Sequence, residues 1–248
     1  MDGLKTYRIS LEEVTSPQGK NFLTEIKKEL AGTLEGARWA DALGYVENRK
    51  TGFDLHSLLE VHERVTKGTV FENARQRRAL VGEPADVDLS GRLRDHQVDT
   101  YVTQGDHIDG DGRRYFLASE LEGYLQNPFF LVSTRETLKT GSQRVRATVR
   151  FVSPSHVRAV TEQVLATAKD SLARAGTRNE KLITLFQLYR ALVSIHPFVD
   201  GNGRAIRLYV IALLKKEGFP TEYFPRLPEY ETPTSRILKE YIAGNGLE

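Results

Sequence analysis

The stretch EKLITLFQLYRALVSI-HPFVDGNG-RAIRLYVIALLKKE (Glu180–Glu217) decides the fold of this chain. The segments on either side of HPFVDGNG carry apolar residues at the spacing of a buried helical face. Gly218 and Pro220 follow the second apolar run, and these residue types commonly end a helix. The pattern therefore predicts two core helices joined by a polar, glycine-containing loop, His196–Gly203.

This loop has the composition of an anion-binding site. A loop that leads into a helix presents free backbone N–H groups and the positive end of the helix dipole. Gly201 and Gly203 lack the side chains that would keep a phosphate away from the backbone. We therefore expect phosphate oxygens to bind at this loop.

Other side chains of the loop and of the next helical turn add catalytic chemistry. His196 has the right basicity to accept a proton from a hydroxyl near neutral pH. Asp200 would repel phosphate unless a divalent cation bridged them, which indicates Mg2+. Arg204 and Arg207 share a helix face, where two guanidinium groups would hold the other phosphates of a triphosphate. Phe198 is expected to plug the core.

The segment HPFVDGNGRAIR (His196–Arg207) resembles the HxFx(D/E)GNGRxxR motif of the Fic family at every fixed position. The resemblance implies a mainly α fold, a Fic-type helical bundle with a small β-hairpin flap over the active site. It also implies a protein adenylyltransferase. Such an enzyme moves AMP from ATP onto a Ser, Thr or Tyr hydroxyl of a target protein and releases pyrophosphate.

By motif position, the resemblance assigns a role to each residue of the site. His196 would be the catalytic base, and Asp200 would be the ligand of the Mg2+ cofactor. Arg204 would hold the β- and γ-phosphates, and Arg207 would reach the γ-phosphate. The full set of nucleotide-binding residues would be Phe198, Gly201, Asn202, Gly203, Arg204 and Arg207, with Asn202 and the two glycines as the anion cradle.

The segment Gly141–Val160 is similar to the flap hairpin of the family. Its apolar residues alternate with arginine and threonine, which predicts a strand at an exposed sheet edge. In the family, such a flap pairs with the backbone of the target protein by β-augmentation. The arginines either form a solvated face that protects the edge or grip an acidic target, and the sequence leaves both open. The docking residues would be Val145, Arg146, Ala147, Thr148, Val149 and Arg150.

The resemblance divides the chain into an N-terminal helical extension, 1–52, and a Fic domain, 53–243, with an insertion at about 69–140. In the extension we expect an amphipathic helix over 21–34 and a second helix over 37–46.

Two segments of the Fic domain have alternative interpretations. The segment Phe53–Gly68 resembles the early helix of the family and carries His62, which we expect to be a hydrogen-bonded core histidine rather than a catalyst. Within the insertion, GDHIDGDG (Gly105–Gly112) is better explained as a hairpin turn than as a calcium loop. His107 and Ala118 occupy positions where that loop needs acidic ligands. A short helix is expected after it, over 119–125.

Composition excludes several classes of function. The 248 residues carry a net charge of +2, too small to indicate a nucleic-acid partner. The absence of cysteine excludes disulfides and thiol chemistry. No apolar run is long enough for a membrane span, and the N-terminal MDGLKTYRIS lacks the apolar stretch of a secretory signal. We expect a cytoplasmic protein, or an effector secreted into a host cell by another signal.

The sequence also bears on how the enzyme is restrained. Many Fic proteins carry an inhibitory helix with the pattern (S/T)xxxE(G/N), whose glutamate pairs with the second arginine of the motif. Here the residue four positions before each Glu-Gly or Glu-Asn pair is neither Ser nor Thr; the glutamates are Glu35, Glu47, Glu72, Glu122 and Glu217. We therefore expect Arg207 to lack an inhibitory motif in its own chain. Either a small antitoxin-like protein supplies the glutamate, or the enzyme is constitutively competent.

Two other functions stay open at this point. A Fic enzyme could use another donor and transfer UMP, phosphocholine or phosphate. Gly203 bears on this, because phosphate-transferring relatives have a lysine there. The second alternative is a non-catalytic Fic-fold module that holds a partner with its insertion and flap.

Overall fold

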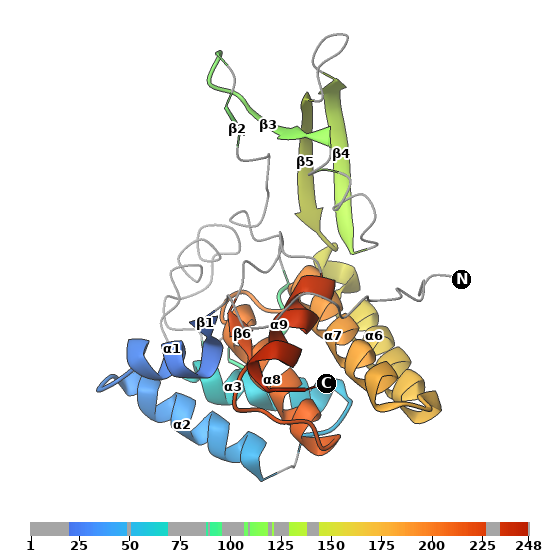
Figure 1. The fold of residues 1–248 in the computed structure, drawn as a ribbon. Helices are drawn as coiled ribbons and strands as arrows, with labels where there is room; N and C mark the ends of the chain where they lie inside the picture. The colour runs from blue at the N-terminus through green and yellow to red at the C-terminus, as the bar shows by residue number, and fades with distance from the viewer. Residues whose placement is uncertain are drawn as a thin grey trace.

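Helix α8 (Asn202–Lys216) is the centre of the fold, because every residue from Ala205 to Leu214 is buried. A helix that is buried all round has neighbours on every side. α2 (Leu34–Glu47), α3 (Leu55–Thr66) and α7 (Arg178–Ile195) pack against α8, which runs through the middle of the helical bundle (Figure 1).

The structure is a computed structural model, and it describes residues 20–48, 51–68, 88, 90–95, 107–108, 110–118, 121, 129–137, 144–226 and 234–247. Three further helices surround the centre: α1 (Phe22–Glu29), α6 (Pro154–Arg174) and α9 (Thr234–Gly244). Side-chain caps begin several of the helices, and Thr177 and Glu180 form a capping box at the start of α7. Within these described ranges, no helix combines the length and apolar character needed to cross a membrane.

The N-terminal helices pack into the same core as the rest of the bundle. The ring of Phe22 meets Trp39 edge-on at 5.6 Å between centroids, and it also contacts Phe224. β1 (Lys20–Asn21) pairs antiparallel with β6 (Pro225–Arg226), so the first described residues lie beside the segment that follows α8. Residues of 20–48 therefore contribute to the hydrophobic core.

The helix expected over 21–34 is wrong in its extent. α1 ends at Glu29, and a turn separates it from α2. Gly32 in this turn has a φ of 74°, and the side chain of Thr33 accepts a hydrogen bond from the backbone N–H of Gly36. A left-handed glycine followed by a capping threonine ends one helix and starts another.

A four-stranded antiparallel sheet projects from one end of the bundle (Figure 1). Its order is β2 (His107–Ile108), β3 (Arg114–Leu117), β5 (Arg144–Phe151) and β4 (Phe130–Thr137). The sheet has a small apolar cluster of its own, which includes Phe116, Phe130 and Val149. A mainly α fold with a small β-hairpin, as expected from the sequence, is confirmed.

A hairpin is confirmed within the segment Gly105–Gly112, in which Gly105, Asp106 and Asp109 lie outside the described residues. β2 and β3 pair antiparallel, with His107 opposite Tyr115, and the glycine-rich turn lies between them. The described residues contain no group of three or more His, Asp or Glu side chains that could hold a metal ion. Most of the helix expected over 119–125 lies outside the described residues.

The expectation that the flap strand lies at an exposed edge needs correction. β5 pairs with β4 along its length, and β3 pairs with its other side at Arg144 and Val145. The first two residues of β5 are therefore inside the sheet, with β3 on one side and β4 on the other. Ala147, Thr148 and Val149 are all buried, so both faces of the strand are covered there, against the expected alternation.

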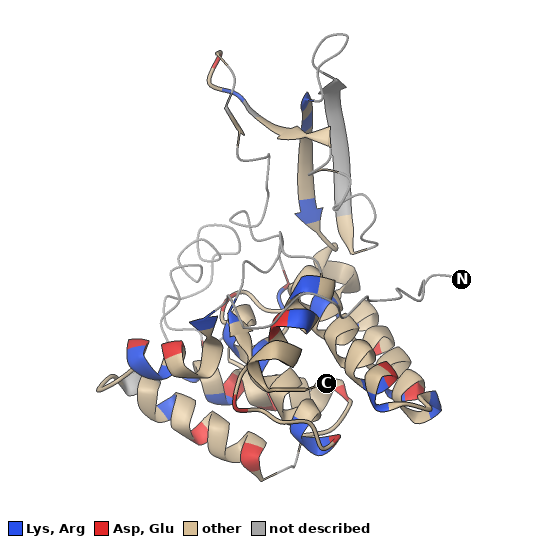
Figure 2. Ribbon diagram, in the orientation of Figure 1, with Lys and Arg blue, Asp and Glu red and all other residues tan. Residues whose placement is uncertain are grey.

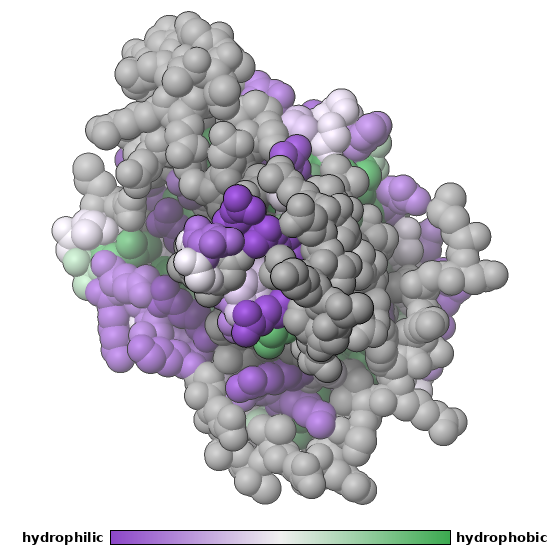
Figure 3. All heavy atoms as spheres, turned by 90° about the horizontal axis from the view of Figure 1, so that it is seen from above, coloured by the Kyte–Doolittle hydropathy of each residue, from purple (hydrophilic) through white to green (hydrophobic). Residues whose placement is uncertain are grey.

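The described surface of the bundle carries interspersed charge. Figure 2 shows acidic and basic residues mixed along α1, α2 and α6, which agrees with the small net charge. On the face seen in Figure 3, the apolar side chains of the described residues form small, separate patches. This part of the surface offers mainly polar contact area.

Candidate active site

The loop between α7 and α8 connects two helix ends with left-handed backbone. His196 ends α7 with φ 52° and ψ 65°, and Gly201 precedes α8 with a φ of 72°. Among the described residues, His196 is the one non-glycine residue with positive φ. Such a conformation costs a non-glycine residue roughly 1–2 kcal/mol, so the surrounding structure must hold it. The first N–H groups of α8 have no acceptor within the helix and are available to an anion.

Asn202 closes the loop on itself. Its side-chain oxygen accepts a hydrogen bond from the backbone N–H of Phe198 at 2.9 Å, and its side-chain nitrogen donates to the carbonyl of Phe198 at 2.8 Å. The amide is therefore used to shape the loop. We infer that Asn202 contributes to an anion cradle through its backbone rather than its side chain.

α3 supports the loop from below through His62, which is buried. The imidazole Nε2 donates to the carbonyl of Asp200 at 2.9 Å, and the backbone N–H of Gly91 donates to its Nδ1 at 3.0 Å. Burial lowers the pKa of His62 to about 4, so the ring is neutral and has one defined tautomer. The ring also stacks on Phe198 with 3.7 Å between centroids. His62 is thus a hydrogen-bonded core histidine, as predicted.

Gly201 lies directly against the same helix. A Cβ atom at this position would stand 2.6 Å from Cγ2 of Thr66. The positive φ and this close approach both require glycine. The glycine thus brings the turn against α3 and sets where α8 begins.

Asp200 is half-buried at the mouth of the loop. Its Oδ1 accepts a hydrogen bond from the backbone N–H of Gly201 at 2.6 Å, which fixes the carboxylate beside the start of α8. The other carboxylate oxygen is a hard ligand of the kind that Mg2+ prefers when it also binds phosphate oxygens. The donor set at this position therefore fits Mg2+.

His196 is almost fully buried, with 3% of its surface exposed. Its ring stacks on Phe151, the last residue of β5, at 4.6 Å between centroids. Burial, and then the positive charge of Arg94, hold the pKa of His196 well below its usual range. The imidazole is neutral at physiological pH and has the protonation state of a base.

The two motif arginines lie in different surroundings. Arg204 is half-buried, and its positive charge contributes to the lowered pKa of His62, which places it near the loop. Arg207 is 7% exposed, and its guanidinium lies 5.0 Å from the centroid of the Phe22 ring. It also donates to the carbonyl of Gly203 at 3.1 Å. Phe22 of α1 therefore covers the arginine that the sequence assigned to the γ-phosphate.

The match to a family model agrees with this arrangement. The Fic/DOC family model matches residues 52–214, about two thirds of the chain. The chain belongs to the Fic/DOC family. The match runs through the described part of the predicted insertion, so residues 90–95 lie within the Fic region.

Curated Fic proteins match over a short segment. The protein adenylyltransferase Fic of Drosophila virilis is 54% identical over 35 residues, which are 14% of this chain and 7% of that protein. The proteins of the same name from Drosophila melanogaster and Drosophila grimshawi match over the same length at 54% and 51% identity. The chain thus matches only a small part of the length of these relatives.

Two solved Fic structures are also similar. The N-terminal Fic domain of Bep8 from Bartonella sp. 1-1C is 16% identical with a TM-score of 0.41, and the alignment covers 77% of this chain and 67% of that one. A Fic-domain signalling protein from Bacteroides thetaiotaomicron is 11% identical with a TM-score of 0.43, and the alignment covers 84% of this chain and 63% of that one.

The predicted flap residues, Val145–Arg150, precede the end of β5 that contacts the Fic motif. Phe151 makes the contact with His196, and β5 leads away from the bundle from there (Figure 1). Val145–Arg150 occupy the part of the strand before Phe151. The structure therefore joins the flap to the motif at its base.

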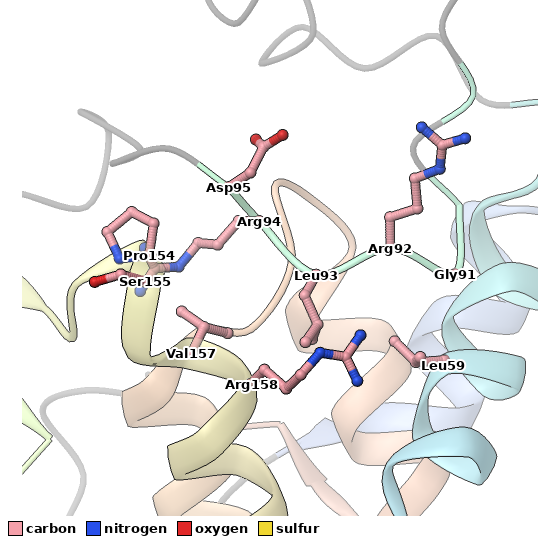
Figure 4. Close-up of a pocket in the computed structure, with 10 residues that line it drawn as sticks. All are labelled: Leu59, Gly91, Arg92, Leu93, Arg94, Asp95, Pro154, Ser155, Val157 and Arg158. Carbon is pink, nitrogen blue, oxygen red and sulfur yellow. The ribbon is translucent and has the colours of Figure 1, made fainter.

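Sequence reasoning missed the segment 90–95, which lies between α3 and the start of α6. It lines a groove with a volume of about 530 Å3, where Leu59, Leu93 and Arg158 converge (Figure 4). The backbone N–H of Arg94 donates to the carbonyl of Pro197 in the motif at 2.8 Å. An arginine in a loop has no local signature that separates it from ordinary surface charge, so no sequence signal marked it.

Proposed function

We propose that this Fic protein is a protein adenylyltransferase that transfers AMP from ATP to a Ser, Thr or Tyr hydroxyl of a target protein. The observation that carries the proposal is the complete motif, His196–Arg207, folded as a loop with a neutral histidine at one helix end and free N–H groups at the next. Family membership supports a transferase, and the short matches to named adenylyltransferases support AMP as the transferred group.

The α- and β-phosphates would bind at the start of α8. The backbone N–H groups of Asn202 and Gly203 would donate to phosphate oxygens, helped by the helix dipole. Arg204 would hold the terminal phosphates. Asp200 would hold Mg2+, which would neutralise phosphate charge there.

His196 would take the proton of the target hydroxyl. The hydroxyl oxygen forms a bond to the α-phosphorus of ATP, and the bond from that phosphorus to the oxygen that bridges it to the β-phosphorus breaks. Pyrophosphate leaves with the electron pair, and the proton goes to the imidazole. The neutral imidazole has the protonation state that accepting a proton requires.

The target would present its hydroxyl next to β5. Among the described strands, β3 pairs with β5 at Arg144 and Val145, and by β-augmentation the backbone of the target would join this sheet. A small antitoxin-like protein is a second possible partner. Either a cytoplasmic enzyme or an effector secreted into a host cell is compatible with these features.

Label transfer tests the proposal. Purified protein is incubated with Mg2+, a cell lysate and ATP labelled at the α-phosphate. Parallel incubations of the wild type contain γ-labelled ATP, labelled UTP or labelled CDP-choline as the donor. His196→Ala removes the base, and His156→Ala is the matched control, because His156 is exposed on α6. We expect α-label on protein with wild type and His156→Ala but not with His196→Ala. Transfer only from another donor, or no transfer from any donor, would refute adenylylation.

A further inference from the structure

One buried arginine joins three parts of the chain at the motif. Arg94 is separated from His196 by 102 residues in the sequence, and its Nε donates to the carbonyl of His196 at 2.7 Å. Its Nη2 donates to the carbonyl of Ile195 at 3.2 Å and to the carbonyl of Val152 at the base of the flap. Its own backbone N–H donates to Pro197 at 2.8 Å. Three of these four hydrogen bonds thus hold the carbonyls of Ile195, His196 and Pro197, and the fourth holds the base of the flap.

These hydrogen bonds are made at the end of α7, where the backbone has the least support from its own helix. Ile195 and His196 end α7, and the last carbonyls of a helix have no partners within it. His196 also has left-handed backbone, a conformation that is unfavourable for a non-glycine residue unless other contacts hold it. A planar guanidinium presents several donors in fixed directions, so it can satisfy adjacent carbonyls at once and hold this conformation.

The same guanidinium sets the position of the flap base. Val152 follows Phe151, whose ring stacks on the imidazole of His196. Arg94 therefore fixes the backbone of His196 from one side and the residue next to its stacking partner from the other. The direction of the imidazole depends on both.

Arg94 is not a surface charge. It is 2% exposed, and burial lowers its pKa to about 10, so it remains positively charged near neutral pH. Burying a charge is costly, and the described partners of this guanidinium are backbone carbonyl groups. A buried cation whose donors bind two carbonyls at His196 and one at the base of the flap points to a role at that histidine.

We propose that Arg94 is a positioning residue for the catalytic base: it holds His196 and the base of the flap in the geometry that proton transfer requires. The kinetic part of this proposal rests on the adenylyltransferase function proposed above. The structural part does not.

The test uses the full chain with Arg94→Gln, Arg94→Lys and, as a matched control, Arg92→Gln, because Arg92 is an exposed arginine two residues away. Near-UV circular dichroism establishes that each variant is folded. The rate of His196-dependent label transfer is measured over a range of ATP concentrations. A displacement of about 1 Å can reduce catalysis about 100-fold, so we expect such a fall in the rate at saturating ATP for Arg94→Gln.

The KM for ATP should change by less than about threefold, because the cradle at Asn202 and Gly203 is held by other contacts. Arg94→Lys keeps the charge but lacks the planar fork, and it should recover part of the rate. Arg92→Gln should match the wild type. The proposal is overturned if Arg94→Gln keeps the wild-type rate. It is also overturned if the KM of Arg94→Gln for ATP rises well beyond about threefold together with the loss of rate.

A second measurement is independent of activity. The imidazole nitrogens are observed by NMR with labelled histidine, and His196→Ala and His62→Gln assign the two buried rings. We expect Arg94→Gln, and Arg94→Lys if the first variant does not fold, to shift the His196 signals and leave those of His62 in place. Unchanged His196 signals would overturn the proposal. If the wild type transfers no label, the proposed function fails, while this spectrum still decides the role of Arg94.

Discussion

Gly201→Ala should weaken the packing of the loop between α7 and α8 on α3. The new Cβ would stand 2.6 Å from Cγ2 of Thr66, and the φ of 72° is unfavourable for alanine. The left-handed backbone costs about 1–2 kcal/mol. Overpacking against a buried methyl costs about 1–3 kcal/mol. We expect the free energy of unfolding to fall by about 2–5 kcal/mol, which is about 4–20 °C in Tm for a chain of this size.

Two further variants separate these costs. Gly218→Ala has a similar φ of 79°, but nothing lies within 4 Å of its added Cβ, so it should show the backbone cost of about 1–2 kcal/mol alone. Thr66→Ser removes the clashing methyl and keeps the hydroxyl, which donates to the carbonyl of His62 at 2.6 Å. In the double variant Gly201→Ala/Thr66→Ser, about 1–3 kcal/mol should return.

Urea and thermal unfolding of the wild type, the three single variants and the double variant measure these energies. A coupling energy between positions 201 and 66 is the decisive quantity, since it isolates the contact from the backbone cost. Equal losses for Gly201→Ala and Gly218→Ala, with no recovery from Thr66→Ser, would show that the loop does not rest on α3 as described.

Three other predictions concern the same core. The pKa of His62 is 6.5 in the unfolded chain and about 4 in the folded chain. Its contribution to stability should therefore be complete above about pH 6.5 and fall by about 3 kcal/mol as the pH drops to about 4. Urea unfolding of His62→Gln should lack this part of the pH dependence. Asn202→Asp replaces the group that donates to the carbonyl of Phe198 with an acceptor, so the free energy of unfolding should fall by about 1–3 kcal/mol. Calorimetry should also show weaker binding of Mg2+-ATP. Unchanged affinity would contradict the role of the amide in shaping the loop. Phe22→Ala should cost about 3–5 kcal/mol in thermal unfolding, because the ring is 1% exposed between Trp39, Phe224 and the guanidinium of Arg207, whereas a cost below about 1 kcal/mol would place Phe22 outside the core.

Several features of this protein depend on short-range patterns, and the sequence predicted them. The two helices around the motif follow from apolar spacing, and the confirmed turn between β2 and β3 follows from its Asp-Gly pairs. The hydrogen-bonded state of His62 followed from its place on an apolar helix face. Each of these signals lies within a few residues of the feature that it predicts, because helical periodicity and turn chemistry are local.

Contacts between distant segments decided the rest. The strand that the sequence placed at an edge is covered at its start by β3. Pairing partners depend on which strand arrives beside another, and neither strand carries that information alone.

The sequence by itself predicted the chemistry of the motif: a histidine base, a carboxylate and an anion cradle in one loop. Only the tertiary structure decided what surrounds them. Arg94 reaches His196 across 102 residues, and Phe22 covers Arg207 from the other end of the chain. The physical reason is that burial and charge depend on packing. A buried cation bonded to carbonyls, or a ring over a guanidinium, exists only once the segments that carry them are brought together.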